Sequence, residues 1–173
     1  DFIEYVSLST LGNASYFGDR TLASSYGHGA ASNGSRGVFA GSEFTRSNVI
    51  DYITFATTGN ATDFGDLTAV SGTSGCSDGT YGLFGRVYNA SGTGSIDYIT
   101  IATLGNATNF GSFPTSKSAS EYASACASEV YGLFLLDEDD QIEYVTIATP
   151  SNSSTFGNLS TVRRRASSTS NGT

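Results

Sequence analysis

Residues 50–68 read IDYITFATTGNATDFGDLT, and this stretch decides the fold because it is one of four similar copies in the chain. The opening phrase recurs as IEYVSLST from Ile3, IDYITIAT from Ile96 and IEYVTIAT from Ile142, at steps of 47, 46 and 46 residues. Each copy continues into a second block, which reads LGNASYFG, TGNATDFG, LGNATNFG and PSNSSTFG in turn. A period in this range is the signature of a propeller, a solenoid or a linear array.

The phrase that begins at Ile50 predicts a strand covered on both faces. Its Ile, Tyr, Thr and Phe residues favour β structure. Alternation places Ile50 and Tyr52 on one face, and Asp51 and Ile53 on the other. Large apolar groups on both faces are typical of an interior strand.

The second block predicts a turn and a short returning strand. Gly59-Asn60 is a hairpin signal, because both residues tolerate positive φ. The Phe of Phe64-Gly65 recurs in every copy, so we expect it to fill the core between neighbouring units. The glycine after it predicts a bulge or a tight bend.

A third shared block predicts another short buried strand in each unit. It reads SRGVFAG from Ser35, TYGLFGR from Thr80 and VYGLFLL from Val130. The Ser- and Gly-rich stretch before it varies in length, which predicts a surface loop. Three or four strands in a unit of about 46 residues match one blade of a β-propeller.

The sequence therefore predicts an all-β, single repeat domain over residues 1–173. We expect about four propeller blades with the last incomplete, and an open array or fibre of the same units as the alternative. The repeats run over 3–49, 50–95, 96–141 and, in part, 142–173. The last repeat stops before its Gly-Val-Phe strand. Three explanations are open: the chain is part of a longer parent, it closes as a small ring with one deficient blade, or a neighbouring chain supplies the missing strand. An unfilled strand position is a template for another chain, so we expect assembly or a longer parent.

Composition and charge exclude some classes of partner. The net charge of −8 disfavours nucleic acid, because phosphate binding requires clustered Lys and Arg. No apolar stretch is long enough to span a bilayer, so we expect no membrane insertion. Cys76 and Cys126 lie six residues before Gly82 and Gly132, in the same register of two successive units. Such a separation usually exceeds the reach of a disulfide, which predicts two small buried thiols.

Residues that could support catalysis or metal binding are few. His28 is the single histidine and lies in a glycine-rich stretch, where we expect it to be solvated. One carboxylate recurs in each copy, at Glu4, Asp51, Asp97 and Glu143. A role in capping a turn or lining a channel explains all four, whereas a glycosidase needs only one pair. The acidic run at 137–140 lacks the glycine and alternating ligands of a calcium loop. We therefore expect no catalytic, cofactor or metal site and no enzyme activity.

Asn-x-Ser/Thr sequons occur at the recurring Gly-Asn turn or its Ser-Asn variant. Turn chemistry explains them without a glycan, although a secreted eukaryotic product would be open to modification there. The candidate attachment sites are Asn13, Asn60, Asn106 and Asn152.

Residues 50–68 resemble, nearly letter for letter, the IDYITIATTGNATDFGDLT unit of large proteins from tailed phages, notably cyanophages, and related metagenomic sequences. The glycine-flanked strands at Gly37 and Gly82 also resemble kelch repeats, without the kelch Trp. The resemblance implies a virion structural protein with no assigned activity. We accordingly expect a structural or host-recognition component of a virion or extracellular fibre, whose partners are its own copies or other virion and fibre proteins. The alternative is a secreted or surface module that adheres to cell-surface glycans through its Tyr-, Ser- and Asn-rich loops.

Overall fold

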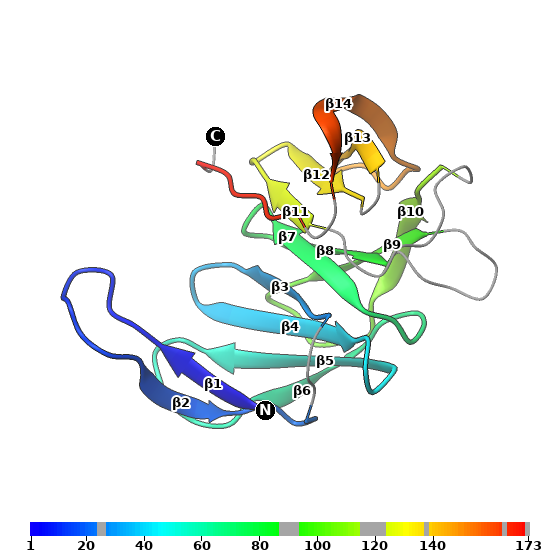
Figure 1. Cartoon of the computed structure of the whole chain (residues 1–173). Coiled ribbons are helices and arrows are strands. Elements are labelled where there is room, and N and C mark those ends of the chain that lie inside the picture. The colour runs from blue at the N-terminus through cyan, green and yellow to red at the C-terminus, as the bar shows by residue number, and fades with distance from the viewer. Residues whose placement is uncertain (24–26, 87–93, 115–123, 137–138, 164–165, 172–173) are drawn as a thin grey trace.

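The computed structural model describes residues 1–23, 27–86, 94–114, 124–136, 139–163 and 166–171 (Figure 1). Over these residues the chain forms fourteen strands and no helix, so it has no helix that could cross a membrane. The strands make four antiparallel sheets, one of two strands and three of four. The all-β prediction is confirmed.

The sheets use the strands in chain order. The two-stranded sheet holds β1 (Phe2–Tyr5) and β2 (Ser15–Asp19). The next holds β3 (Gly29–Ser32), β4 (Arg36–Ser42), β5 (Ser47–Thr54) and β6 (Thr62–Asp66). The third holds β7 (Thr73–Ser77), β8 (Tyr81–Arg86), β9 (Ser95–Thr100) and β10 (Thr108–Ser112). The last holds β11 (Ser124–Ala127), β12 (Tyr131–Leu135), β13 (Asp139–Thr146) and β14 (Ser154–Arg163).

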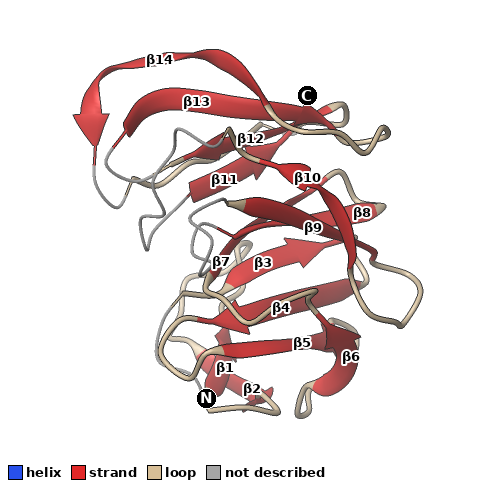
Figure 2. Ribbon diagram, turned by 90° about the vertical axis from the view of Figure 1, so that its right-hand side faces the viewer, coloured by secondary structure: helices blue, strands red, loops and turns tan. Residues whose placement is uncertain are grey.

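Each four-stranded sheet is a meander, in which strands adjacent in the chain pair with each other. The sheets follow one another in space from β1–β2 to β11–β14, each packed on the next (Figure 2). The repeated phrase supplies the third strand of each full sheet, in β5, β9 and β13. The meander is the order expected of a propeller blade, whereas the number of blades stays a prediction.

The incomplete sheet is the first one, and the expectation that the last would be incomplete was wrong. The β11–β14 sheet has four strands, while β1 and β2 pair only with each other. The difference arises because each Gly-Val-Phe or Gly-Leu-Phe strand pairs with the repeated phrase that follows it. Repeats counted from Ile3 therefore begin in the middle of a sheet.

The Ser- and Gly-rich stretch contains the first strand of each full sheet, so its prediction as a surface loop was wrong in part. These strands are β3, β7 and β11, and β7 packs against both of the others. Their backbones approach closely, since a Cβ on Gly75 would lie 2.5 Å from the carbonyl oxygen of Ala30. Small residues permit this approach, and their low β propensity hid the strand.

The predicted bulge at Phe-Gly is confirmed in all four copies. In β5 and β6, Ile50 pairs with Gly65 and Asp51 pairs with Asp63, so Phe64 is the extra residue. The same register shift occurs between β1 and β2, β9 and β10, and β13 and β14. A bulge re-aims a side chain, and here it turns the Phe toward the next sheet.

The prediction that the repeated strand is covered on both faces is also confirmed for β5. Ile50 is buried in a cluster with Phe64 and with Phe84 of the following sheet. Ile53 is buried in a separate cluster with Phe17 of the preceding sheet. Each interior sheet therefore contributes to two cores, one on each side.

Candidate functional site

The recurring residues meet where one sheet packs on the next, and we call this contact the joint. In the first joint, the loop after β5 lies along β2 of the preceding sheet. The amide of Gly59 donates to the carbonyl of Phe17 at 2.9 Å, and that of Ala61 donates to the carbonyl of Asp19 at 2.8 Å. The side-chain oxygen of Asn60 accepts from the amide of Asp19 at 3.1 Å. Contacts between alternate residues are the pattern of parallel strands, with the Asn side chain in place of a backbone carbonyl.

The second joint repeats the same bonds one unit later. Gly105 donates to Phe64 at 3.0 Å and Ala107 donates to Asp66 at 2.8 Å, both through backbone atoms. Asn106 accepts from the amide of Asp66 at 3.0 Å.

The third joint keeps the two bonds around its Asn. Ser153 donates to the carbonyl of Ser112 at 3.1 Å, and Asn152 accepts from the amide of Ser112 at 3.0 Å. Its loop has Ser151 where the other two joints have glycine. A side chain is therefore compatible with that position of the loop.

The glycine of the Phe-Gly bulge is required by the closeness of the joint. A Cβ on Gly18 would lie 2.1 Å from the carbonyl oxygen of Gly59, and one on Gly65 would lie 2.4 Å from that of Gly105. At Gly111 the same distance, to the oxygen of Ser151, would be 2.0 Å. Any side chain at these positions would push the next loop away.

The predicted turn and returning strand are confirmed, because β5 and β6 are antiparallel neighbours, but Gly59-Asn60 does not form a tight turn between them. Seven residues separate Thr54, the end of β5, from Thr62, the start of β6. Gly59 and Asn60 lie within this loop and are held by the preceding sheet. The pair serves the contact between sheets, which local sequence patterns could not indicate.

The Phe of the bulge fills the core of the joint in three of the four copies, as the sequence predicts, whereas Phe156 of the fourth copy is 60% exposed. Phe17, Phe64 and Phe110 are only 7%, 3% and 3% exposed. In the first joint Phe17 packs with Ile53 and Ala61 of the following sheet. Phe110 packs in the third joint with Val145, the counterpart of Ile53.

The recurring carboxylates of the two middle copies are buried, and they do not line a channel. Asp51 accepts from the Nε of Arg20 at 2.9 Å and from the hydroxyl of Thr21, both contributed by the preceding unit. Asp97 accepts from the amide and hydroxyl of Thr68, each at 2.9 Å at its closest. Both side chains are 0% exposed and tie one unit to the one before it.

The carboxylates of the outer copies differ from these two. Glu143 is also fully buried, but it accepts from Ser153 at 2.9 Å and Thr155 at 3.3 Å within its own unit. Glu4 is exposed on β1. Asp97 has a further partner, since Arg86 contacts it at 3.2 Å from the same sheet.

His28 lies in a loop, as the sequence predicts, but it is partly buried and not fully solvated. Its Nδ1 donates to the carbonyl of Gly41 at 3.2 Å. Burial lowers the pKa of His28, and the bond to Gly41 partly opposes that effect. The ring therefore joins the Gly27–Gly29 stretch to the end of β4.

No group of three or more His, Cys, Asp or Glu side chains that could hold a metal occurs within the described parts of the chain. The acidic run falls partly outside those parts, at residues 137 and 138. Asp139 accepts from the amide of Asp140 at 2.7 Å, and Asp140 accepts from the side chain of Asn158 at 3.2 Å. Both described acids thus have local partners.

Both cysteines are free, as the sequence predicts, although only Cys76 is fully buried. A Cβ on Gly132 of the next sheet would lie 3.4 Å from the Cys76 sulfur, which shows how closely that sheet covers it. Burial is the main cause that raises the pKa of Cys76 to about 12. Cys126 is half-buried on the last sheet.

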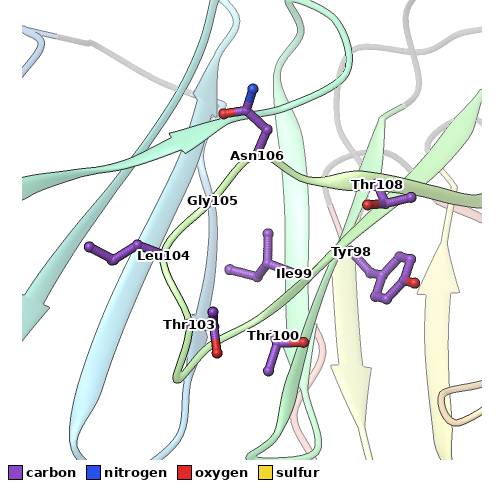
Figure 3. Close-up of a pocket in the computed structure, with 8 residues that line it drawn as sticks. All are labelled: Tyr98, Ile99, Thr100, Thr103, Leu104, Gly105, Asn106 and Thr108. Carbon is purple, nitrogen blue, oxygen red and sulfur yellow. The ribbon is translucent and has the colours of Figure 1, made fainter.

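A small hollow recurs beside the joint loop. In the third sheet it has a volume of about 260 Å³ and is lined by Tyr98, Thr100, Thr103, Thr108 and neighbouring residues (Figure 3). The equivalent hollow in the second sheet measures about 140 Å³. Asn106, at the rim, points toward the preceding sheet, whose Asp66 amide it accepts from.

All four candidate glycan sites are exposed asparagines of the loop between the last two strands of a sheet. In three of them, Asn60, Asn106 and Asn152, the side-chain oxygen accepts a hydrogen bond in a joint. The sequence did not indicate this role, because turn chemistry already explained these residues. Their recurrence at one fixed position was the available signal.

No protein-family model matches the sequence, and no curated protein matches it. Among solved structures, a chain of Kuenenia stuttgartiensis hydrazine synthase is similar at 11% identity and a TM-score of 0.49, over 76% of this chain and 36% of that chain. This chain thus spans well under half the length of that structure, and likeness at this level carries no argument about activity.

Proposed function

We propose that the chain is a non-catalytic structural or host-recognition component of a phage virion or an extracellular fibre. It acts through assembly surfaces built from its repeats, as kelch-like propeller blades or an open array of them. Its partners are copies of itself or other virion and fibre proteins, with no nucleic acid and no membrane insertion. Its location is the virion or the outside of a cell.

One observation carries this proposal. In the described units, the positions that recur from copy to copy are mostly used to join one sheet to the next. The Phe-Gly bulge and the Asn of the loop form the joint, and Asp51 and Asp97 tie neighbouring units together. Selection for stacking explains such a pattern, because a catalytic centre requires different residues converging on one point.

Immunogold electron microscopy with antibodies against the purified chain tests the proposal. We expect gold on virion tails, fibres or other extracellular filaments from cultures that carry this sequence. An antibody pre-absorbed with the chain is the control. Gold confined to the interior of cells would contradict the proposal.

The alternative function, a carbohydrate-binding or adhesive module, is favoured by the recurring hollow. Its hydroxyl-rich lining, which includes Tyr98, Thr100 and Thr103, suits hydrogen bonding to sugars. A glycan array is the direct test, with Thr103→Val as the matched variant because it removes one hydroxyl at nearly constant volume. The alternative requires binding that the variant weakens, and an array without signal would exclude it.

A further inference from the structure

The first sheet presents half of a joint that no described residue covers. Gly12 and Asn13 occupy the positions of Gly59 and Asn60. Val6 is 53% exposed. Its counterparts in the three joints are buried: Ile53 is 6% exposed, Ile99 4% and Val145 2%. Leu11, on the same loop, is fully exposed.

The last sheet presents the other half. Phe156 is 60% exposed, whereas the Phe of every other copy is at most 7% exposed. Nothing lies within 4 Å of a Cβ placed on Gly157, where each preceding bulge glycine meets the next loop at 2.4 Å or less. The described part of the C-terminal segment, 166–171, has Ser168 beside Ser124 at 2.6 Å, on β11 at the opposite edge of the sheet from β14.

We propose that these two faces bind each other between copies of the chain, so that the loop of one copy seats on the bulge of the next. The internal joints specify the bonds. Gly12 donates to the carbonyl of Phe156, Ala14 donates to the carbonyl of Asn158, and Asn13 accepts from the amide of Asn158. Val6 and Ala14 then cover Phe156. This inference rests on the proposed function and names its partner as a second copy.

A second copy is the occupant that the molecule itself argues for. The chain forms this contact three times with its own sequence, so both halves are already shaped for one another. Val6 and Phe156 are exposed, whereas their counterparts in the joints are buried. Exposed apolar patches mark interaction sites. The two faces lie at opposite ends of the stack, on β1–β2 and on β14 (Figure 2).

A contact between two different faces has a defined consequence for assembly. Such a heterologous contact adds copies in one direction, and it yields a ring where the rotation closes or a filament where it does not. The net charge of −8 on each copy opposes the approach, so added salt should strengthen the association.

Sedimentation velocity of the full chain, over about 1 to 500 µM and at two salt concentrations, tests the inference. We expect oligomers that grow with concentration. Gly157→Ala should weaken the association at least about tenfold, because its methyl group meets the incoming loop as at Gly18. Gly12→Ala is the matched control and should associate normally, since Ser151 occupies that position in the third joint. Asn13→Ala, which removes one hydrogen bond, should weaken association about fivefold.

Circular dichroism should show that Gly157→Ala folds like the parent chain, because its methyl group has open space in a single copy. A parent chain that stays monomeric at every concentration would overturn the inference, and so would association that Gly157→Ala leaves unchanged. Neither result contradicts immunogold labelling of virions or fibres, where other proteins could cover the same faces. The two proposals therefore fail independently.

Discussion

The joint at Phe64-Gly65 and the uncovered face at Phe156-Gly157 have the same sequence motif in two different surroundings. Phe64 is buried and Gly65 touches the next loop, whereas Phe156 is largely exposed and Gly157 faces open space. The motif alone therefore does not determine burial; the adjacent sheet does. The buried pair Phe64-Gly65 therefore has an exposed counterpart in the same chain, so one protein contains both a test site and its control.

The largest effect is expected from the aromatic core of the joint. Phe64→Ala removes a buried ring from a cluster that spans two sheets and should lower the free energy of unfolding by about 4 kcal/mol. Phe156→Ala should cost about 1 kcal/mol or less, because its ring is mostly exposed and contacts Tyr144 edge-on. Urea denaturation followed by circular dichroism measures both, and equal losses would break the comparison.

A buried charge should give the next largest effect. Asp97→Asn keeps the shape of the side chain but leaves the Arg86 guanidinium, 6% exposed, without its counter-charge. Removing one partner of a buried pair should cost about 3 kcal/mol. Glu4→Gln is the control at the exposed end, where we expect a change within about 0.5 kcal/mol. Thermal unfolding of both variants at neutral pH provides the measurement.

Substitutions of the bulge glycines test the same comparison by adding a methyl group, without removing any group. Gly111→Ala places a methyl group 2.0 Å from the carbonyl oxygen of Ser151, so the third joint must open, at about 2 kcal/mol. Gly157→Ala should change stability by no more than about 0.5 kcal/mol when measured at low protein concentration. A tolerant Gly111 would show that the last sheet can shift freely, contrary to the joint described above.

The hydrogen bond of the joint Asn should contribute less to the free energy of unfolding. Asn106→Ala deletes the acceptor of the Asp66 amide and should cost about 1 kcal/mol. Asn13→Ala, in a dilute and monomeric sample, should leave the free energy of unfolding unchanged within error. Hydrogen exchange adds a local measurement, because the Asp66 amide should exchange faster only in the Asn106 variant.

Thiol labelling sharpens the comparison without altering stability. Cys76 lies under Gly132 of the following sheet, and its raised pKa, about 12, disfavours the reactive thiolate. Cys126 holds the same register on the last sheet and is half-buried. We expect Cys126 to react with iodoacetamide at least about tenfold faster at pH 8, as judged by mass spectrometry of labelled peptides. Faster labelling of Cys76 would mean that the cover over β7 is loose.

Sequence patterns predicted the parts of the fold that depend on local periodicity. The repeated strand, its coverage on both faces at Ile50 and Ile53, and the bulge at Phe64-Gly65 follow from alternation and from glycine chemistry. The first strand of each full sheet was missed because residues such as Gly29 and Ala30 have low β propensity. They form a strand because tight packing against β7 requires small side chains.

The joint was missed for a different reason. Gly59-Asn60 satisfies the local rule for a hairpin, and only the position of the preceding sheet shows that it binds Phe17 and Asp19. The point in the repeat at which each sheet begins is likewise set by pairing between β4 and β5. Counting repeats from Ile3 cannot show this pairing. Long-range pairing decided both features.

The joint also bears on how such a chain can change its length in evolution. Its hydrogen bonds are made by backbone atoms and one Asn side chain, and one glycine permits the close approach. Each unit carries both the loop and the bulge that form a joint. A duplicated unit would therefore arrive with a loop that fits the unit before it and a bulge that fits the unit after it. Unequal recombination could lengthen or shorten the array in a single event, with no compensating substitution required.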